Sequence, residues 1–142
     1  MGQRAGMSPE QGALLESMKV EPSPVTDVAF DAGRLFQVWS YRVGHSQLVL
    51  RSNRDAEYPT RVELLFKSVS AVHLPTAMSA LAVRVLQTDA ELPEWAGPQD
   101  GRNVYAIQFS GGRGYVVAGA AFVAEDALDF TAPSPFAGSL GE

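Results

Sequence analysis

The sequence LFQVWSYRVGHSQLVLR at residues 35–51 decides the fold class. Its first nine residues, 35–43, are rich in β-branched and aromatic side chains that alternate along the chain, with Phe36 and Val38 on one side. A Gly-His-Ser turn and a returning strand, 47–51, follow, so the stretch predicts an antiparallel hairpin. Because both faces of the first strand carry apolar groups, we expect that strand to lie in the centre of a sheet.

A second hairpin is predicted nearer the C-terminus, where residues 104–109 and 115–123 are joined by Ser-Gly-Gly-Arg-Gly at 110–114. Glycine permits the positive φ angles that tight hairpin turns require. A phosphate-binding loop of similar composition would lie between a strand and a helix. Here a strand follows the glycines, so the hairpin interpretation is favoured.

Further strands are predicted between the two hairpins. Residues 61–66 alternate cleanly. Val62, Leu64 and Phe66 face one way, and Arg61, Glu63 and Leu65 face the other. Lys67 and Ser68 interrupt the pattern, which predicts a bulge or bend before the next apolar run at 69–74. Residues 78–86 alternate again. Their alanines and leucines leave a helix open as an alternative, but the spacing of the valines favours a strand.

Six or seven strands joined largely by hairpins predict a mainly β domain, α+β at most, built as an antiparallel meander. We expect a strongly bent sheet or a small open barrel. One short N-terminal helix is predicted from Ser8, its N-cap, to about Val20. The predicted organisation is a helix and linker at 1–24, a single β-rich domain at 25–130 and a flexible tail at 131–142.

The composition limits the classes of function. The chain has 142 residues, 46% of them hydrophobic, which is enough for one core. A net charge of -5 argues against a nucleic-acid partner, which needs a basic surface. The absence of cysteine excludes disulfides and thiolate metal sites, and fits a reducing compartment. No signal peptide is recognised, and the apolar run 115–123 has about half the length of a membrane span, so we expect a cytoplasmic protein without a membrane partner.

The residues predict no catalytic site, cofactor site or metal site. His45 and Ser46 are adjacent in the first hairpin turn, but neighbouring strand residues point to opposite faces, which is a poor geometry for a base and its nucleophile. His73 is the second of only two histidines, so a histidine-rich metal site is not available. We therefore expect a protein that is not an enzyme.

The segment 88–102 is a long acidic loop that is the first candidate for an interaction site. An exposed tryptophan surrounded by charge is a common anchor at protein interfaces, and acidic side chains suit a partner with a basic surface. Solvation of the acids is the simpler alternative. The candidate residues are Glu91, Glu94, Trp95 and Asp100.

The aromatic residues of the strands suggest a different class of site. In a curved sheet they would line a pocket for a small molecule or lipid on the concave face, although aromatic residues in strands are more often core or cross-strand pairs. The candidate ligand-pocket residues are Trp39, Tyr41, Tyr105, Phe109 and Tyr115.

Residues 34–52 and 61–69, with Leu74-Pro75, resemble small uncharacterised bacterial β-rich domain proteins of actinomycete type. They are similar, more weakly, to β-rich immunity proteins of bacterial toxin systems. Neither resemblance carries a catalytic motif, and both imply a stand-alone domain that acts by binding.

The leading hypothesis from the sequence is thus a non-enzymatic protein-interaction module, antitoxin-like or accessory, with an unknown and basic protein partner. The alternative is a small-molecule or lipid-binding domain. An enzyme of unrecognised type would need a histidine or a carboxylate pair to converge in one cleft. A homodimer through an exposed strand edge is compatible with each of these hypotheses.

Overall fold

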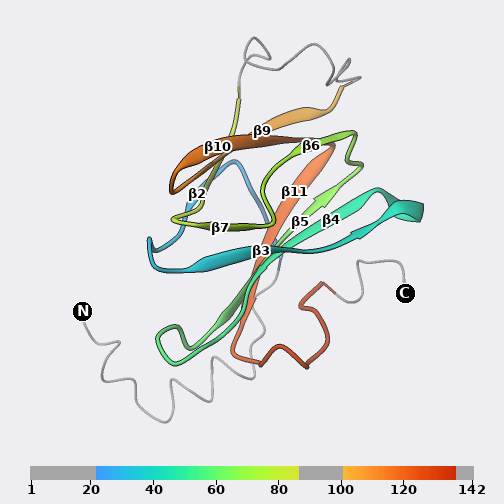
Figure 1. Ribbon diagram of the computed structural model, residues 1–142. Helices are drawn as coiled ribbons and strands as arrows, with labels where there is room; N and C mark the ends of the chain where they lie inside the picture. Colours follow the sequence, from blue (N-terminus) through green and yellow to red (C-terminus); the bar gives the residue numbers. More distant parts are fainter. Residues whose placement is uncertain (1–21, 87–100, 137–142) are drawn as a thin grey trace.

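The computed structural model describes residues 22–86 and 101–136. In this part of the chain the protein is mainly β, with antiparallel strands in two sheets (Figure 1). Sheet A has the order β1-β11-β5-β4-β3-β7 and sheet B the order β2-β8-β9-β10-β6; both orders are linear, so neither sheet closes on itself. The strands are β1 (Ser23–Pro24), β2 (Asp27–Ala29), β3 (Leu35–Arg42), β4 (Gln47–Ser52), β5 (Arg61–Lys67), β6 (Ala71–His73), β7 (Ala77–Ser79), β8 (Ala82–Val85), β9 (Asn103–Phe109), β10 (Gly112–Ala118) and β11 (Ala120–Asp126).

The mainly β, antiparallel character predicted from the sequence is confirmed. The predicted N-terminal helix lies outside the described residues. The described residues form eleven strands where the sequence predicted six or seven, because several apolar runs are divided at bends. The alternating run 78–86, for example, forms β7 and β8, which confirms the strand interpretation over the helical one.

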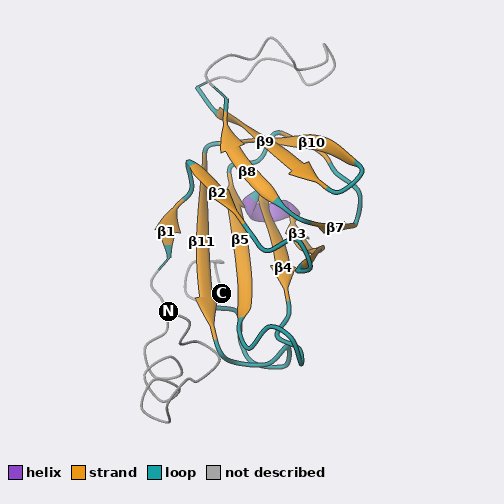
Figure 2. Ribbon diagram, turned by 90° about the vertical axis from the view of Figure 1, so that its left-hand side faces the viewer, coloured by secondary structure: helices purple, strands orange, loops and turns teal. Residues whose placement is uncertain are grey.

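Among the described residues, six connections carry the chain from one sheet to the other, between β1 and β2, β2 and β3, β5 and β6, β6 and β7, β7 and β8, and β10 and β11. The bend predicted at Lys67 and Ser68 is one of them, and Ser68 has a φ of 56°. Ala80 has a φ of 54° between β7 and β8, and Gly119 separates β10 from β11. Strands that switch sheets in this way make the corners of sandwiches whose sheets cross. In Figure 2 the antiparallel strands β11, β5 and β4 lie roughly vertical, and β8, β9 and β10 cross them obliquely.

Both predicted hairpins are present. The first joins β3 to β4 through a 3-10 turn, η1 (Val43–His45), and Ser46 closes this turn in the left-handed region. The second joins β9 to β10, with Phe109 opposite Gly112, so only two residues form the turn. One of them is Gly111 with a φ of 91°, which explains why glycine is needed there.

The main hydrophobic core lies between the sheets. Sheet A contributes Phe36, Leu50, Leu64 and other residues of its inner face, and sheet B contributes Ile107 and its neighbours. These side chains follow the two-residue alternation of the strands, because successive residues point to opposite faces. The core therefore fixes which side of each strand faces the other sheet.

The predicted central position of residues 35–43 is wrong. In sheet A, β3 lies next to the last strand, and the centre is formed by β5 and β4. All six residues of β4 are buried, whereas Leu35 and Trp39 of β3 are exposed. The reason is that β4 and β5 are covered on both faces, one by sheet B and the other by a chain segment that follows β11.

This covering segment, residues 127–136, lies against the outer face of sheet A. Phe136 packs with Val49, Leu65 and Ala124 in a second hydrophobic cluster. The sequence predicted a flexible tail from residue 131; the first six residues of that tail lie against the sheet, and the others lie outside the described residues. Among the described residues, no helix has the length and apolar character needed to cross a membrane.

Candidate functional site

The acidic-loop candidates fall outside the described residues. Glu91, Glu94, Trp95 and Asp100 all lie in the segment 87–100. Their role as an interaction site therefore stays a prediction.

The five aromatic candidates do not surround one cavity. Tyr105 lies in the main core, with its ring edge-on to that of Phe66 at a centroid distance of 5.5 Å, and Phe109 packs against the same core. Tyr115 lies on the opposite face of sheet B, beside Val104 and Val117. The remaining two, Trp39 and Tyr41, are exposed on β3 of sheet A.

Trp39 belongs to an exposed aromatic surface on the outer face of sheet A. The guanidinium carbon of Arg51 lies 4.2 Å from the centroid of the Trp39 ring, a cation–π geometry. The Arg51 Nη1 also donates to the backbone oxygen of Phe130 at 3.3 Å. Trp39 is 41% exposed and Phe130 is 62% exposed, whereas Arg51 is only 4% exposed. Trp39 and Phe130 both contact the Arg51 guanidinium, and we use the name Trp39 surface for these three groups.

A buried ion pair holds this surface in place. The Arg51 Nε donates to the Glu63 carboxylate with an N–O distance of 2.5 Å, and the second oxygen of that carboxylate accepts from the hydroxyl of Ser134. Glu63 is fully buried. Buried charges need complete pairing, so the Arg51 guanidinium has little freedom to move. The Trp39 ring is consequently held against a fixed guanidinium, although Trp39 itself is 41% exposed.

Local sequence explains how Trp39 reaches this position. The register of β3 against β4 shifts between Val38 and Ser40, a β-bulge with Trp39 as the additional residue. Bulges re-aim side chains, and this one coincides with the contact between Trp39 and the guanidinium of Arg51. The sequence analysis placed Trp39 among the candidate pocket residues, and alternation alone could not show the bulge that places the ring on an arginine.

A second buried ion pair fastens the covering segment. Arg61 is fully buried, and its guanidinium donates twice to the Asp126 carboxylate, at 2.9 and 2.8 Å. The same guanidinium donates to the backbone oxygens of Asp129, Ala132 and Pro133. Because all of its donors are used within the protein, we assign Arg61 a structural role.

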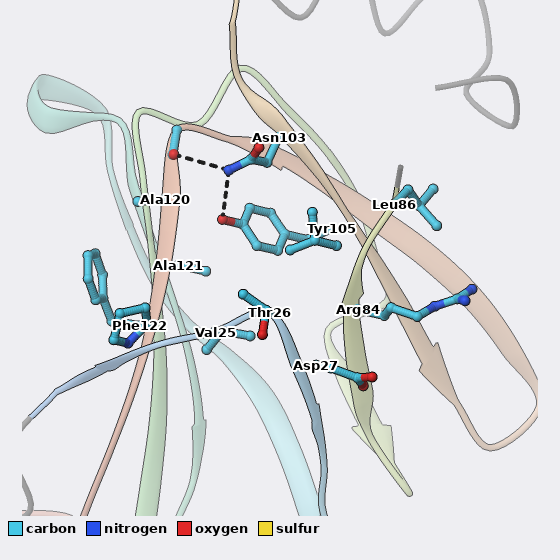
Figure 3. Close-up of a pocket in the computed structure, with 13 residues that line it drawn as sticks. Val25, Thr26, Asp27, Arg84, Leu86, Asn103, Tyr105, Ala120, Ala121 and Phe122 are labelled. Carbon is cyan, nitrogen blue, oxygen red and sulfur yellow. Dashed lines mark hydrogen bonds between the residues drawn. The ribbon is translucent and has the colours of Figure 1, made fainter. Parts of the chain in front are cut away.

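A cleft of about 720 Å³ opens where the two sheets separate (Figure 3). Its walls come from the β1–β2 corner, the end of β8, the start of β9 and the β10–β11 corner. Tyr105 is the only one of the five predicted aromatic residues that lines it. Asn103 Nδ2 donates to the Tyr105 hydroxyl at 3.3 Å and to the Gly119 oxygen at 3.4 Å, and both bonds are drawn in Figure 3.

The two histidines lie on different elements. His45 is exposed in η1, and the ring of His73 on β6 stacks on that of Tyr115 at a centroid distance of 5.6 Å. Burial raises the pKa of the Tyr115 hydroxyl. Within the described ranges, histidine, aspartate and glutamate side chains form no group of three that could hold a metal ion.

Comparison with known proteins gives no match: no family model, no curated protein and no solved structure is similar to this chain. The resemblance to small bacterial β-rich proteins and to immunity proteins stays a prediction from the sequence. The site residues stand on the geometry of this chain alone.

Proposed function

We propose that this chain is a non-enzymatic protein-interaction module and that the Trp39 surface contacts its partner. The observation that carries the proposal is a tryptophan ring that is 41% exposed and yet fixed on a buried arginine. A large apolar ring in contact with water is unfavourable, and a partner that covers it removes this cost.

Rigidity adds to the case for this surface. An interface pays for every side chain that loses rotamer freedom on binding, so a ring already held by Arg51 binds at lower entropic cost. Tryptophan and arginine are the residue types most enriched among the side chains that dominate binding energy. The nearby Phe130, 62% exposed, would enlarge the contact.

The chemistry of the partner follows from charge. The chain has a net charge of -5, so we propose a partner with a basic surface, as an antitoxin-like or accessory protein would have. Glu91, Glu94, Trp95 and Asp100 would contribute to the same interaction through their acidic loop. We propose the cytoplasm as the compartment, because the chain has no cysteine.

A homodimer is the second candidate. Within the described residues, β7 pairs with Leu35–Gln37 of β3. The backbone N–H of Val38 also donates a hydrogen bond to the backbone oxygen of Thr76. The remainder of β3 has β4 as its one described neighbour. Such an edge accepts another strand, although the bulge at Trp39 makes the pairing shorter.

The experiment is a quantitative pull-down from native lysate with four forms of the chain, each first checked for equal folding by circular dichroism and thermal unfolding. The forms are wild type, Trp39→Ala, the control Val72→Ala, and the triple variant Glu91→Lys, Glu94→Lys, Trp95→Ala. Val72 is the matched control because it is also an exposed apolar side chain but lies on β6 of sheet B.

The proposal requires one protein that wild type and Val72→Ala capture in stoichiometric amount and that Trp39→Ala loses by at least tenfold. The captured protein is then purified and titrated directly against both forms. Equal affinity for wild type and Trp39→Ala would refute the role of the Trp39 surface. Loss with the triple variant alone would move the site to the acidic loop, and light scattering of the purified chain separates a homodimer from a different partner.

A further inference from the structure

The cleft between the sheets is independent of the Trp39 surface and has the dimensions of a small-molecule site. Its volume of about 720 Å³ lies within the range of about 300–1,000 Å³ that ligand pockets occupy. The β1–β2 and β10–β11 corners both line it, together with the end of β8 and the start of β9. In Figure 3 the Tyr105 ring lies above Thr26 of the β1–β2 corner and to the right of Ala120 at the start of β11.

The walls of the cleft are mainly apolar. Val25, Ala121 and Phe122 line one side, and Val85 and Leu86 line the side formed by β8. An apolar body of a few carbons would lose its contact with water between these walls, which is favourable in proportion to the area covered.

One end of the cleft offers a buried hydrogen-bond donor. Tyr105 is 2% exposed, and its hydroxyl oxygen accepts from Asn103 Nδ2 at 3.3 Å. Among the described residues, the hydroxyl proton of Tyr105 has no acceptor. A ligand oxygen in the cleft that accepts this proton would replace a water molecule there and add a hydrogen bond that fixes the ligand's orientation.

The charges that line the cleft cancel. One acidic residue, Asp27, and one basic residue, Arg84, line the cleft. They are cross-strand neighbours on β2 and β8, and both are exposed. The chain as a whole is acidic, with a net charge of -5, which works against an anionic ligand. The acceptor presented to Tyr105 should therefore be uncharged.

We propose that this cleft binds a small neutral carbonyl compound, an amide or a ketone with a short apolar body, whose carbonyl oxygen accepts the proton of the Tyr105 hydroxyl. The apolar body lies between Ala121 and Val85. The proposal does not depend on the protein-interaction function, because no residue of the Trp39 surface lines the cleft.

The test is a titration of the ¹⁵N-labelled full chain with hexanamide and, separately, with hexanoate, followed by amide chemical shifts. The two probes share one apolar body and differ in the charge of the head group. For a ligand of this size the dissociation constant should be about millimolar. We expect hexanamide to move the resonances of Val25, Tyr105 and Ala121 and to bind at least fivefold more tightly than hexanoate.

Three variants make the result specific. Tyr105→Phe should weaken hexanamide binding at least fivefold, and Ala120→Trp, which fills the cleft, should abolish it. Tyr115→Phe removes a hydroxyl from the other face of sheet B and should leave the affinity unchanged. Failure of both probes to bind, tighter binding of hexanoate, or equal affinity of wild type and Tyr105→Phe would each overturn the proposal, and none of these results bears on the Trp39 surface.

Discussion

Arg61 and Asp126 face each other across β5 and β11 and form a two-point ion pair, with Nε–Oδ1 at 2.9 Å and Nη2–Oδ2 at 2.8 Å. Both side chains are buried. The guanidinium also binds three backbone oxygens of the covering segment 127–136. One arginine therefore joins two strands of sheet A to the segment that covers them.

Replacing Arg61 by leucine should destabilise the protein by about 3–5 kcal/mol, because Asp126 would keep a buried charge without its partner. Urea unfolding followed by tryptophan fluorescence measures the change. The double variant Arg61→Leu, Asp126→Leu should recover part of the loss, while the exposed control Arg84→Leu should stay within about 0.5 kcal/mol of wild type. An Arg61→Leu protein as stable as wild type would contradict the structural role.

The contact between Trp39 and Arg51 predicts a measurable coupling. A double-mutant cycle with Trp39→Ala and Arg51→Met should give a coupling energy of about 0.5–1 kcal/mol, the value of a partly exposed cation–π pair. Urea unfolding followed by circular dichroism provides the four stabilities, because two of the four forms lack Trp39. Additive effects of the two substitutions would mean that Arg51 does not hold the ring, and the argument from a fixed anchor would then fail.

The acidity of Asp129 reports the fold of the covering segment. The Thr131 hydroxyl and backbone N–H donate to its carboxylate, at 2.6 and 3.0 Å, and the hydroxyl bond is the largest cause that lowers the pKa of Asp129. A carboxyl whose folded pKa is lowered stabilises the fold above its ordinary pKa, and that contribution disappears as the pH falls through the lowered value.

Thr131→Val should accordingly raise the pKa of Asp129 towards its ordinary value, as measured by ¹³C NMR titration of the side-chain carboxyl. Thr76→Val, an exposed threonine beside β7, is the control and should leave the Asp129 titration unchanged. A titration of Asp129 that does not respond to Thr131→Val would show that the segment is not ordered around this bond.

Because β10 and β6 pack closely, substitution by alanine should change the stability very differently at two glycines, Gly114 and Gly44. A Cβ added at Gly114 would overlap the backbone oxygen of His73, whereas one added at Gly44 would meet no atom within 4 Å. Gly114→Ala should cost about 1–3 kcal/mol and Gly44→Ala less than about 0.5 kcal/mol, both measured by thermal unfolding. Equal stability of the two variants would place β6 away from β10.

The local parts of the fold were predictable from sequence. The hairpins around Gly44 and Gly111 follow from alternation and turn residues, and the bend at Ser68 follows from a break in that alternation. The division into two sheets was not predictable, because β11 pairs with β5 and β3 with β7 across long stretches of chain. No short-range pattern encodes those pairings.

The covering segment and the site show the same limit. Residues 131–136 have the composition of a flexible tail, and they are held by the guanidinium of Arg61, about 70 residues earlier in the chain. For β3, alternation revealed apolar groups on both faces but could not show whether the outer face is covered. The strand next to it, β4, is covered by the segment, and Trp39 is left exposed.

The most direct test of the central claim is photo-crosslinking in the native cell with a benzophenone amino acid at Gln37, which is exposed on β3 two residues before Trp39 and lies opposite Arg51. The matched control carries the same group at Val72 on β6. The account predicts one dominant crosslinked protein at position 37 that is absent at position 72 and is lost when Trp39→Ala is added. Identical adducts at both positions, or adducts at position 37 that survive Trp39→Ala, would contradict it.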